Sequence, residues 1–177
     1  MKTSKVFELI LNIIVVLLFL GAGITVLLLR RLSEGYDSIL LGTVLIVVGS
    51  ARGVIYIISK GYKYRRNITF ITSLAMIGLG IVFLVSDRDI ETLCFGWGMM
   101  ELILGSIEVY IDVLELKEDK IAIAEMAINL GTIVFAILLC IKMSAGLTGH
   151  LIFLGISLIL LAALQTFKLV RSLRSKE

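Results

Sequence analysis

Six long runs of apolar residues constrain the fold of this 177-residue chain more than any other feature. A transmembrane helix needs about 20 predominantly apolar residues to cross a hydrocarbon layer about 30 Å thick. Each run is near that length, 59% of the residues are hydrophobic, and the mean hydropathy is +1.06. We therefore expect an all-α, polytopic membrane helix bundle that forms a single transmembrane domain over residues 1–177. The expected spans are Val6–Leu29, Ser38–Ile58, Ile68–Val85, Leu93–Leu114, Ile121–Ile141 and Leu147–Phe167, of which the third is the shortest.

A spaced pattern of residues recurs in the second, fourth and sixth runs. A glycine begins it, a second small residue follows seven positions later, and a polar residue follows three positions after that. Because seven residues make about two helical turns and ten make nearly three, each trio lies along one helix face. The copies begin 56 and 57 residues apart (98 − 42 and 155 − 98), which predicts three pseudo-repeated helical hairpins, at about 1–62, 63–118 and 119–177. The trios are Gly42, Gly49 and Arg52; Gly98, Gly105 and Glu108; and Gly155, Ala162 and Gln165.

The small residues of this pattern are interpreted mainly as helix-packing positions, and so is Gly53. Small side chains let helix backbones approach closely in lipid, where the burial of apolar surface no longer drives association. The first and third runs carry a related match, since Gly21 and Gly23 lie 57 residues before Gly78 and Gly80. We expect the hairpins to pack side by side through such positions.

The basic residues are divided unequally between the two sides of the membrane. With six spans both termini share a side, which takes twelve Lys and Arg residues against four on the opposite side. This excess predicts that both termini are cytoplasmic. The formal net charge of +3 is then a topology signal, and Lys63, Arg65 and Arg66 form an anchor for the lipid bilayer rather than a nucleic-acid patch. The first run is expected to be an uncleaved helix rather than a secretion signal, because its apolar sequence continues to Leu29.

Polar residues inside the runs are the main candidates for function, since each costs a few kcal/mol at the bilayer centre unless it is paired or hydrated. Glu101, Glu108 and Asp112 share one face of the fourth run, where three ionised carboxylates would be costly together. Arg52 and Glu108 lie at similar depths from the cytoplasmic ends of their runs. This predicts an Arg52–Glu108 pair, with Gln165 nearby at the equivalent level.

Two further polar residues, Glu125 and Asn129, are one turn apart in the fifth run and are expected to join this cluster from the cytoplasmic side. Two interpretations of the cluster stay open. In the structural one, polar groups hold the hairpins together and fix their order. In the functional one, Glu101, Glu108 and Asp112 line a route for protons or cations, because a carboxyl group accepts and releases a proton with modest movement.

The remaining reactive side chains indicate no enzyme. His150, the only histidine, lies near the outer end of the sixth run and is a candidate pH sensor, with an ordinary interface residue as the alternative. Cys94 and Cys140 are interpreted as two thiols rather than a disulfide. The sequence contains no metal-ligand spacing, no phosphate-binding loop and no serine or zinc hydrolase motif, so we expect no catalytic residues, no metal and no cofactor.

The pattern of small residues, as in Leu41-Gly42-Thr43 through Val48-Gly49-Ser50 and Leu104-Gly105-Ser106, resembles the HdeD-like family over nearly the whole chain. These are small bacterial inner-membrane proteins, classed as a domain of unknown function and linked by name to acid resistance. The resemblance implies a non-enzymatic membrane protein of the bacterial inner membrane that acts in envelope or acid-stress protection, as a homo-oligomer or with other membrane proteins. The alternative is a small proton or cation transporter or channel that uses the carboxylate stripe.

Overall fold

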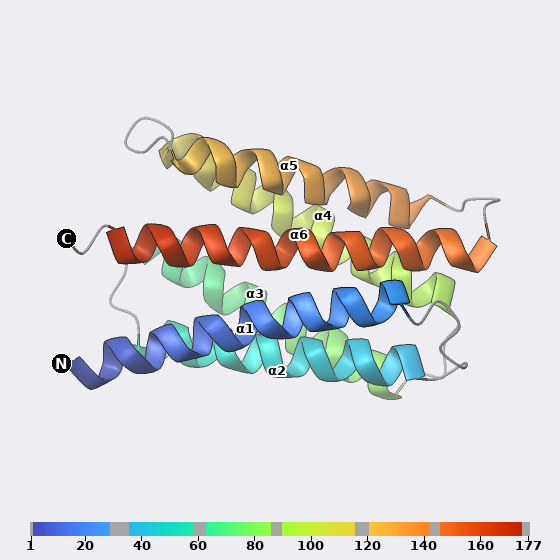
Figure 1. Cartoon of the computed structure of the whole chain (residues 1–177), viewed down its shortest axis with the longest axis horizontal. Coiled ribbons are helices and arrows are strands. Elements are labelled where there is room, and N and C mark those ends of the chain that lie inside the picture. Colours follow the sequence, from blue (N-terminus) through green and yellow to red (C-terminus); the bar gives the residue numbers. More distant parts are fainter. Residues whose placement is uncertain are drawn as a thin grey trace.

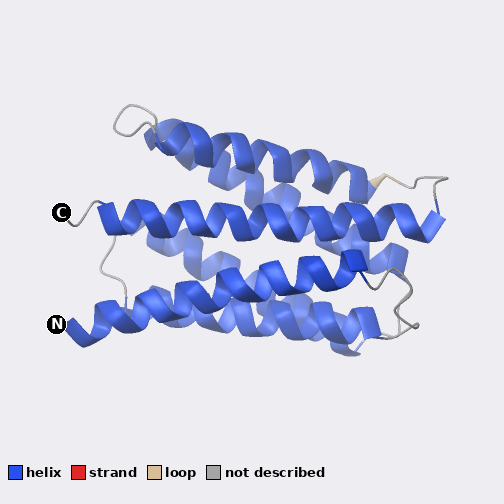
Figure 2. Cartoon of the chain, in the orientation of Figure 1, coloured by secondary structure: helices blue, strands red, loops and turns tan. Residues whose placement is uncertain are grey.

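The computed structural model describes residues 2–28, 36–58, 63–85, 90–115, 121–141 and 146–174 of the chain, and these form six long α-helices. The helices lie side by side and alternate in direction, so both termini lie at one end of the bundle (Figure 1). We call this the terminal end. Helix is the only regular structure among the described residues (Figure 2). The helices are α1 (Lys2–Leu28), α2 (Tyr36–Ile58), α3 (Lys63–Val85), α4 (Ile90–Glu115), α5 (Ile121–Cys140) and α6 (Gly146–Arg174).

Five of the helices are long and apolar enough to cross a membrane. The exception is α3, whose apolar stretch, Thr69–Val85, is the run that the sequence analysis found shortest. Large apolar side chains cover much of the outer surface, among them Leu17 at 61% and Ile57 at 79% exposure. Such a surface suits contact with lipid, in which every backbone polar group must be satisfied within its own helix. The prediction of an all-helical bundle is therefore confirmed, and five of its helices have the length and apolar composition of membrane spans.

The closest helix pairs are not the predicted hairpins. The most extensive contacts join α2 with α3, α4 with α5, and α1 with α6, whereas α3 and α4 touch only slightly. In Figure 1, α1 and α6 lie side by side along the front of the bundle. The closest contacts therefore join helices of different predicted hairpins. They connect the first hairpin with the second through α2 and α3, the second with the third through α4 and α5, and the first with the third through α1 and α6.

The glycine that begins each sequence trio lies where one of these close pairs brings two helix backbones together. A Cβ atom built on the glycine would lie too close to a carbonyl oxygen of the facing helix, so the two backbones are in direct contact. The built Cβ atom would lie 2.9 Å from the Gly80 oxygen at Gly42, 2.8 Å from the Ala136 oxygen at Gly98, and 3.1 Å from the Gly23 oxygen at Gly155. In the first two contacts, the glycine and its partner are the same number of positions apart in the sequence, 38 in each case (80 − 42 and 136 − 98).

The second small residue of each trio also faces a neighbouring helix. The Ser73 hydroxyl of α3 donates a 2.7 Å hydrogen bond to the Gly49 carbonyl oxygen. A Cβ on Gly53 would lie 2.9 Å from the same hydroxyl, and one on Gly105 would lie 3.1 Å from an isoleucine of α5. Ala162 is 3% exposed. Close approach of this kind gains van der Waals contact, which is a main source of helix association in lipid.

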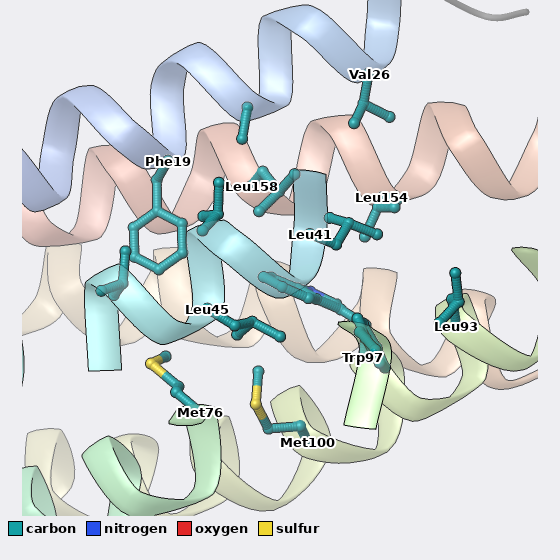
Figure 3. Close-up of a cluster of buried hydrophobic side chains, with 14 of the residues drawn as sticks. Phe19, Val26, Leu41, Leu45, Met76, Leu93, Trp97, Met100, Leu154 and Leu158 are labelled. Atoms are coloured by element: carbon teal, nitrogen blue, oxygen red, sulfur yellow. The ribbon is translucent and has the colours of Figure 1, made fainter. Parts of the chain in front are cut away.

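The apolar core occupies the middle of the bundle and the half away from the termini. Trp97 of α4 lies at its centre and is fully buried, with Leu41 and Leu45 of α2 beside it (Figure 3). Phe19 of α1 and Leu158 of α6 contribute from the front helices. The buried polar side chains of α4 to α6 lie mainly in the other half, toward the terminal end. The bundle therefore has an apolar half and a polar half.

Candidate functional site

Three carboxyl groups of α4 point toward the interior of the bundle. Glu101 is 4% exposed and Asp112 is fully buried, while the Glu108 side chain is 18% exposed. Their spacings of seven and four residues place them on one helix face, as the sequence pattern predicted. The structure divides them into two groups, however, because Glu108 and Asp112 lie near the terminal end and Glu101 lies at mid-helix.

Glu108 has a direct partner that lies one residue beyond the sixth expected span, Leu147–Phe167. Lys168 of α6 donates a 2.6 Å hydrogen bond to Glu108 Oε2, and each side chain is 18% exposed. Arg52, the predicted partner, interacts electrostatically with Glu108 and lines the same cavity. The predicted Arg52–Glu108 neighbourhood is present, and Lys168 is the closer cation. Its position three residues after Gln165, on the same helix face, is the signal that could have indicated it.

Two more polar contacts tie α4, α5 and α6 together near the terminal end. Asn129 of α5 donates a hydrogen bond from Nδ2 to Asp112 Oδ2. Arg171 of α6 donates from Nη1 to Glu125 Oε2 of α5 at 3.2 Å, and Glu125 is fully buried. Glu125 and Asn129 thus join the cluster from the terminal end, as expected. Arg171 was not predicted, because it was counted among the cytoplasmic basic residues.

A partly open cavity of about 180 Å³ lies beside this cluster, and we call it the terminal cavity. Four charged side chains line it: Glu8 of α1, Arg52 of α2, Glu108 of α4 and Lys168 of α6. Gln165 of α6 completes its polar face and is 9% exposed. The Gln165 Nε2 atom has no hydrogen-bond acceptor within the described part of the chain. The cavity is also lined by Asn12, Ile55, Thr69, Thr72, Ile111 and Leu169.

Glu101 lies apart from the terminal cavity, at the boundary between the polar and the apolar half. Ser157 of α6 donates a 2.6 Å hydrogen bond to Glu101 Oε2. The Trp97 indole N–H approaches the same carboxyl group without reaching hydrogen-bond geometry. Ser157 and Trp97 are both fully buried. The sequence analysis missed Ser157, although it lies on α6 between the polar positions His150 and Gln165.

A second cavity, of about 190 Å³, lies at the end opposite the termini, and we call it the distal cavity. His150, the candidate pH sensor, lines it and is 3% exposed, so it is a buried residue rather than an exposed loop residue. Glu91 and Cys140 line the same cavity. Neither Cys140 nor the buried Cys94 is part of a disulfide. Within the described ranges, no three His, Cys, Asp or Glu side chains are arranged to hold a metal ion.

Comparison of the chain with protein-family models, curated proteins and solved structures finds no match. The class that the fold defines is a helical bundle with the surface and helix lengths of a membrane protein. Its polar groups can hold helices together, bind a small solute, or exchange protons with water in the two cavities.

Proposed function

We propose that this chain is a non-enzymatic, multi-pass membrane protein that passes protons along the carboxyl groups of α4. The observation that carries this proposal is the position of Glu101, buried at mid-helix between a cavity containing Glu91 and His150 and a cavity containing Glu108. A buried carboxyl group at the centre of a membrane helix is costly, and such groups commonly mark proton relays.

The spacing along α4 sets the steps of this route. Glu91 and Glu101 are ten residues apart, or about 15 Å along the helix axis, and Glu101 and Glu108 are about 10 Å apart. Both separations exceed a hydrogen bond, so water would have to enter between these groups, and the step from Glu91 to Glu101 would pass the apolar core around Trp97. Glu101 would accept a proton from the distal side, with Ser157 holding its carboxyl group, and release it toward Glu108.

The topology of the proposed protein follows from its sequence. We propose that all six helices, α3 included, cross the bacterial inner membrane with both termini in the cytoplasm. The excess of basic residues on the side of the termini supports this orientation. We also propose three pseudo-repeats of the HdeD-like kind, supported by the trios that begin at Gly42, Gly98 and Gly155. Protection against envelope or acid stress is the physiological role that this resemblance implies.

A second candidate function is association with other membrane components, including further copies of this chain, without transport. It is supported by the pairing of Glu108 with Lys168 and of Glu125 with Arg171, which tie α6 to α4 and to α5. In that case the polar groups hold the bundle together. Removing one partner of such a pair would then destabilise the fold, because it leaves the other charge buried and uncompensated.

Proton flux into proteoliposomes separates the two candidates. Purified protein is reconstituted with a pH-sensitive dye inside the vesicles, and the outside is acidified. We expect the natural protein to acidify the interior faster than empty vesicles, and Glu101→Gln to abolish the difference while unfolding at the same temperature. Ser106→Ala is the matched control, because Ser106 lies on the exposed face of the same helix. Flux equal to that of empty vesicles, or flux unchanged in Glu101→Gln, would reject the proton route.

A further inference from the structure

We propose that the terminal cavity is a binding site for a small zwitterion that carries one carboxylate and one ammonium group. This goes beyond the proton route, because Glu101 does not line the cavity and the proposed ligand need not be moved across the membrane. Three properties of the cavity support the proposal: its balance of charge, an unpaired polar group in its wall, and its size.

The charge of the cavity wall is balanced, with Arg52 and Lys168 against Glu8 and Glu108. A simple anion would meet two carboxylates there, and a simple cation would meet two basic groups. A zwitterion avoids both repulsions and loses less on leaving water than an unpaired ion would. Lys168 and Glu108 already contact each other at 2.6 Å. The other two charges of the wall are those of Arg52 on α2, which also interacts with Glu108, and of Glu8 on α1, and these two would hold the ends of the ligand.

Gln165 provides an independent sign of a missing ligand atom. Its side chain is 91% buried, and its Nε2 atom has no acceptor within the described part of the chain. Buried polar groups in folded proteins are nearly always hydrogen-bonded, and an unsatisfied donor is unfavourable. A carboxylate oxygen of the ligand would satisfy this donor. Arg52 lines the same wall and would bind the second oxygen as a charge-assisted partner.

The volume restricts the ligand to a small molecule. At about 180 Å³, the cavity has room for a small organic molecule. An ω-amino carboxylate such as glycine, β-alanine or 4-aminobutyrate has this size and both required charges. The site also lies at the terminal end, which faces the cytoplasm in the proposed topology.

Binding to the purified full chain in detergent micelles tests the proposal. Glycine, β-alanine and 4-aminobutyrate are titrated by calorimetry, with acetate and methylammonium as probes that carry only one of the two charges. We expect at least one ω-amino carboxylate to bind, and both single-charge probes to bind at least about tenfold more weakly, as loss of one charge-assisted contact implies. No binding by any of the three amino acids, or equally strong binding of acetate or methylammonium, overturns the proposal.

Variants then assign the contacts. Arg52→Gln and Gln165→Leu are each expected to weaken binding of the amino acid about tenfold or more. If Arg52→Gln does not fold, Glu8→Gln takes its place, because Glu8 lies near the beginning of α1. It removes the proposed contact with the ammonium group and should weaken binding as well. Glu101→Gln is the matched control and should bind normally, because it lies outside the cavity. Normal binding by a folded Gln165→Leu or Glu8→Gln protein contradicts the site. Binding that survives in Glu101→Gln while flux is lost separates this proposal from the proton route.

Discussion

Two glycines of α3 offer a direct test of the close packing between helices. Gly78 and Gly80 are two residues apart, yet their surroundings differ completely. A Cβ on Gly78 would have no atom within 4 Å. A Cβ on Gly80 would lie 2.8 Å from the Gly42 carbonyl oxygen and 3.0 Å from the Leu45 Cβ atom. The first of these atoms is part of the α2 backbone and the second is bonded directly to it, so neither can move without displacing that helix.

The comparison of Gly80→Ala with Gly78→Ala isolates the cost of this contact. Alanine raises helix propensity by up to about 1 kcal/mol over glycine, and this gain is similar at both positions, so it cancels. What remains is overpacking against α2, which costs about 1–3 kcal/mol. We therefore expect the Gly80→Ala protein to be less stable than the Gly78→Ala protein by that amount. The folding equilibrium would differ by about 5- to 150-fold.

Reversible unfolding in mixed detergent micelles measures this difference. Each variant is titrated with sodium dodecyl sulfate, and the loss of tertiary structure is followed by the fluorescence of the single tryptophan. A parallel pair exists in α1, where a Cβ on Gly21 would have no neighbour within 4 Å and one on Gly23 would lie 2.9 Å from the Gly155 carbonyl oxygen. If both alanine variants of a pair are equally stable, the helices are not in backbone contact and the reasoning fails.

Three further predictions concern the buried polar groups and the core. Lys168→Met should destabilise the protein by about 1–3 kcal/mol, because it leaves the Glu108 carboxylate uncompensated. Adding Glu108→Gln removes that charge and should recover part of the lost stability. A double variant no more stable than Lys168→Met would contradict a direct pair. The fluorescence of Trp97 should be blue-shifted and shielded from aqueous quenchers, since the indole is fully buried; strong quenching would place it in water. In the folded protein a maleimide should react with Cys140 before Cys94, which is fully buried, and mass spectrometry should find two free thiols; a mass two hydrogens lower would indicate a disulfide.

The helices themselves could be predicted from the sequence because a bilayer permits few alternatives. Each apolar run must satisfy its backbone hydrogen bonds internally, so run length alone predicts a helix. The expected spans accordingly lie within the observed helices, except that Leu29 is outside the described residues and Ile141 follows the end of α5. The pairing of helices could not be predicted in this way. The trio that begins at Gly42 shows which face of α2 packs, but not that Gly80 of α3 is its neighbour.

The sequence predicted the depth at which the polar residues lie, but only some of the contacts between them. Arg52 and Glu108 were placed at one level because both were counted from the same side of the membrane. Lys168 and Arg171 were missed because both follow Phe167, the end of the sixth expected span, and were counted only as basic residues on the side of the termini. Their long side chains instead reach inward to buried carboxylates. Side-chain direction of this kind depends on the neighbouring helices, which one sequence does not specify.

The contact between α1 and α6 has a consequence for how the chain is made. The first residue of α6 comes 118 positions after the last residue of α1 (146 − 28), and a ribosome takes roughly 6–24 s to add that length at about 5–20 residues per second. During that interval the surface of α1 around Gly23 has no permanent neighbour. Completion of the bundle must therefore wait for the last helix to be translated, and α1 would be the segment most in need of a chaperone or insertase until then.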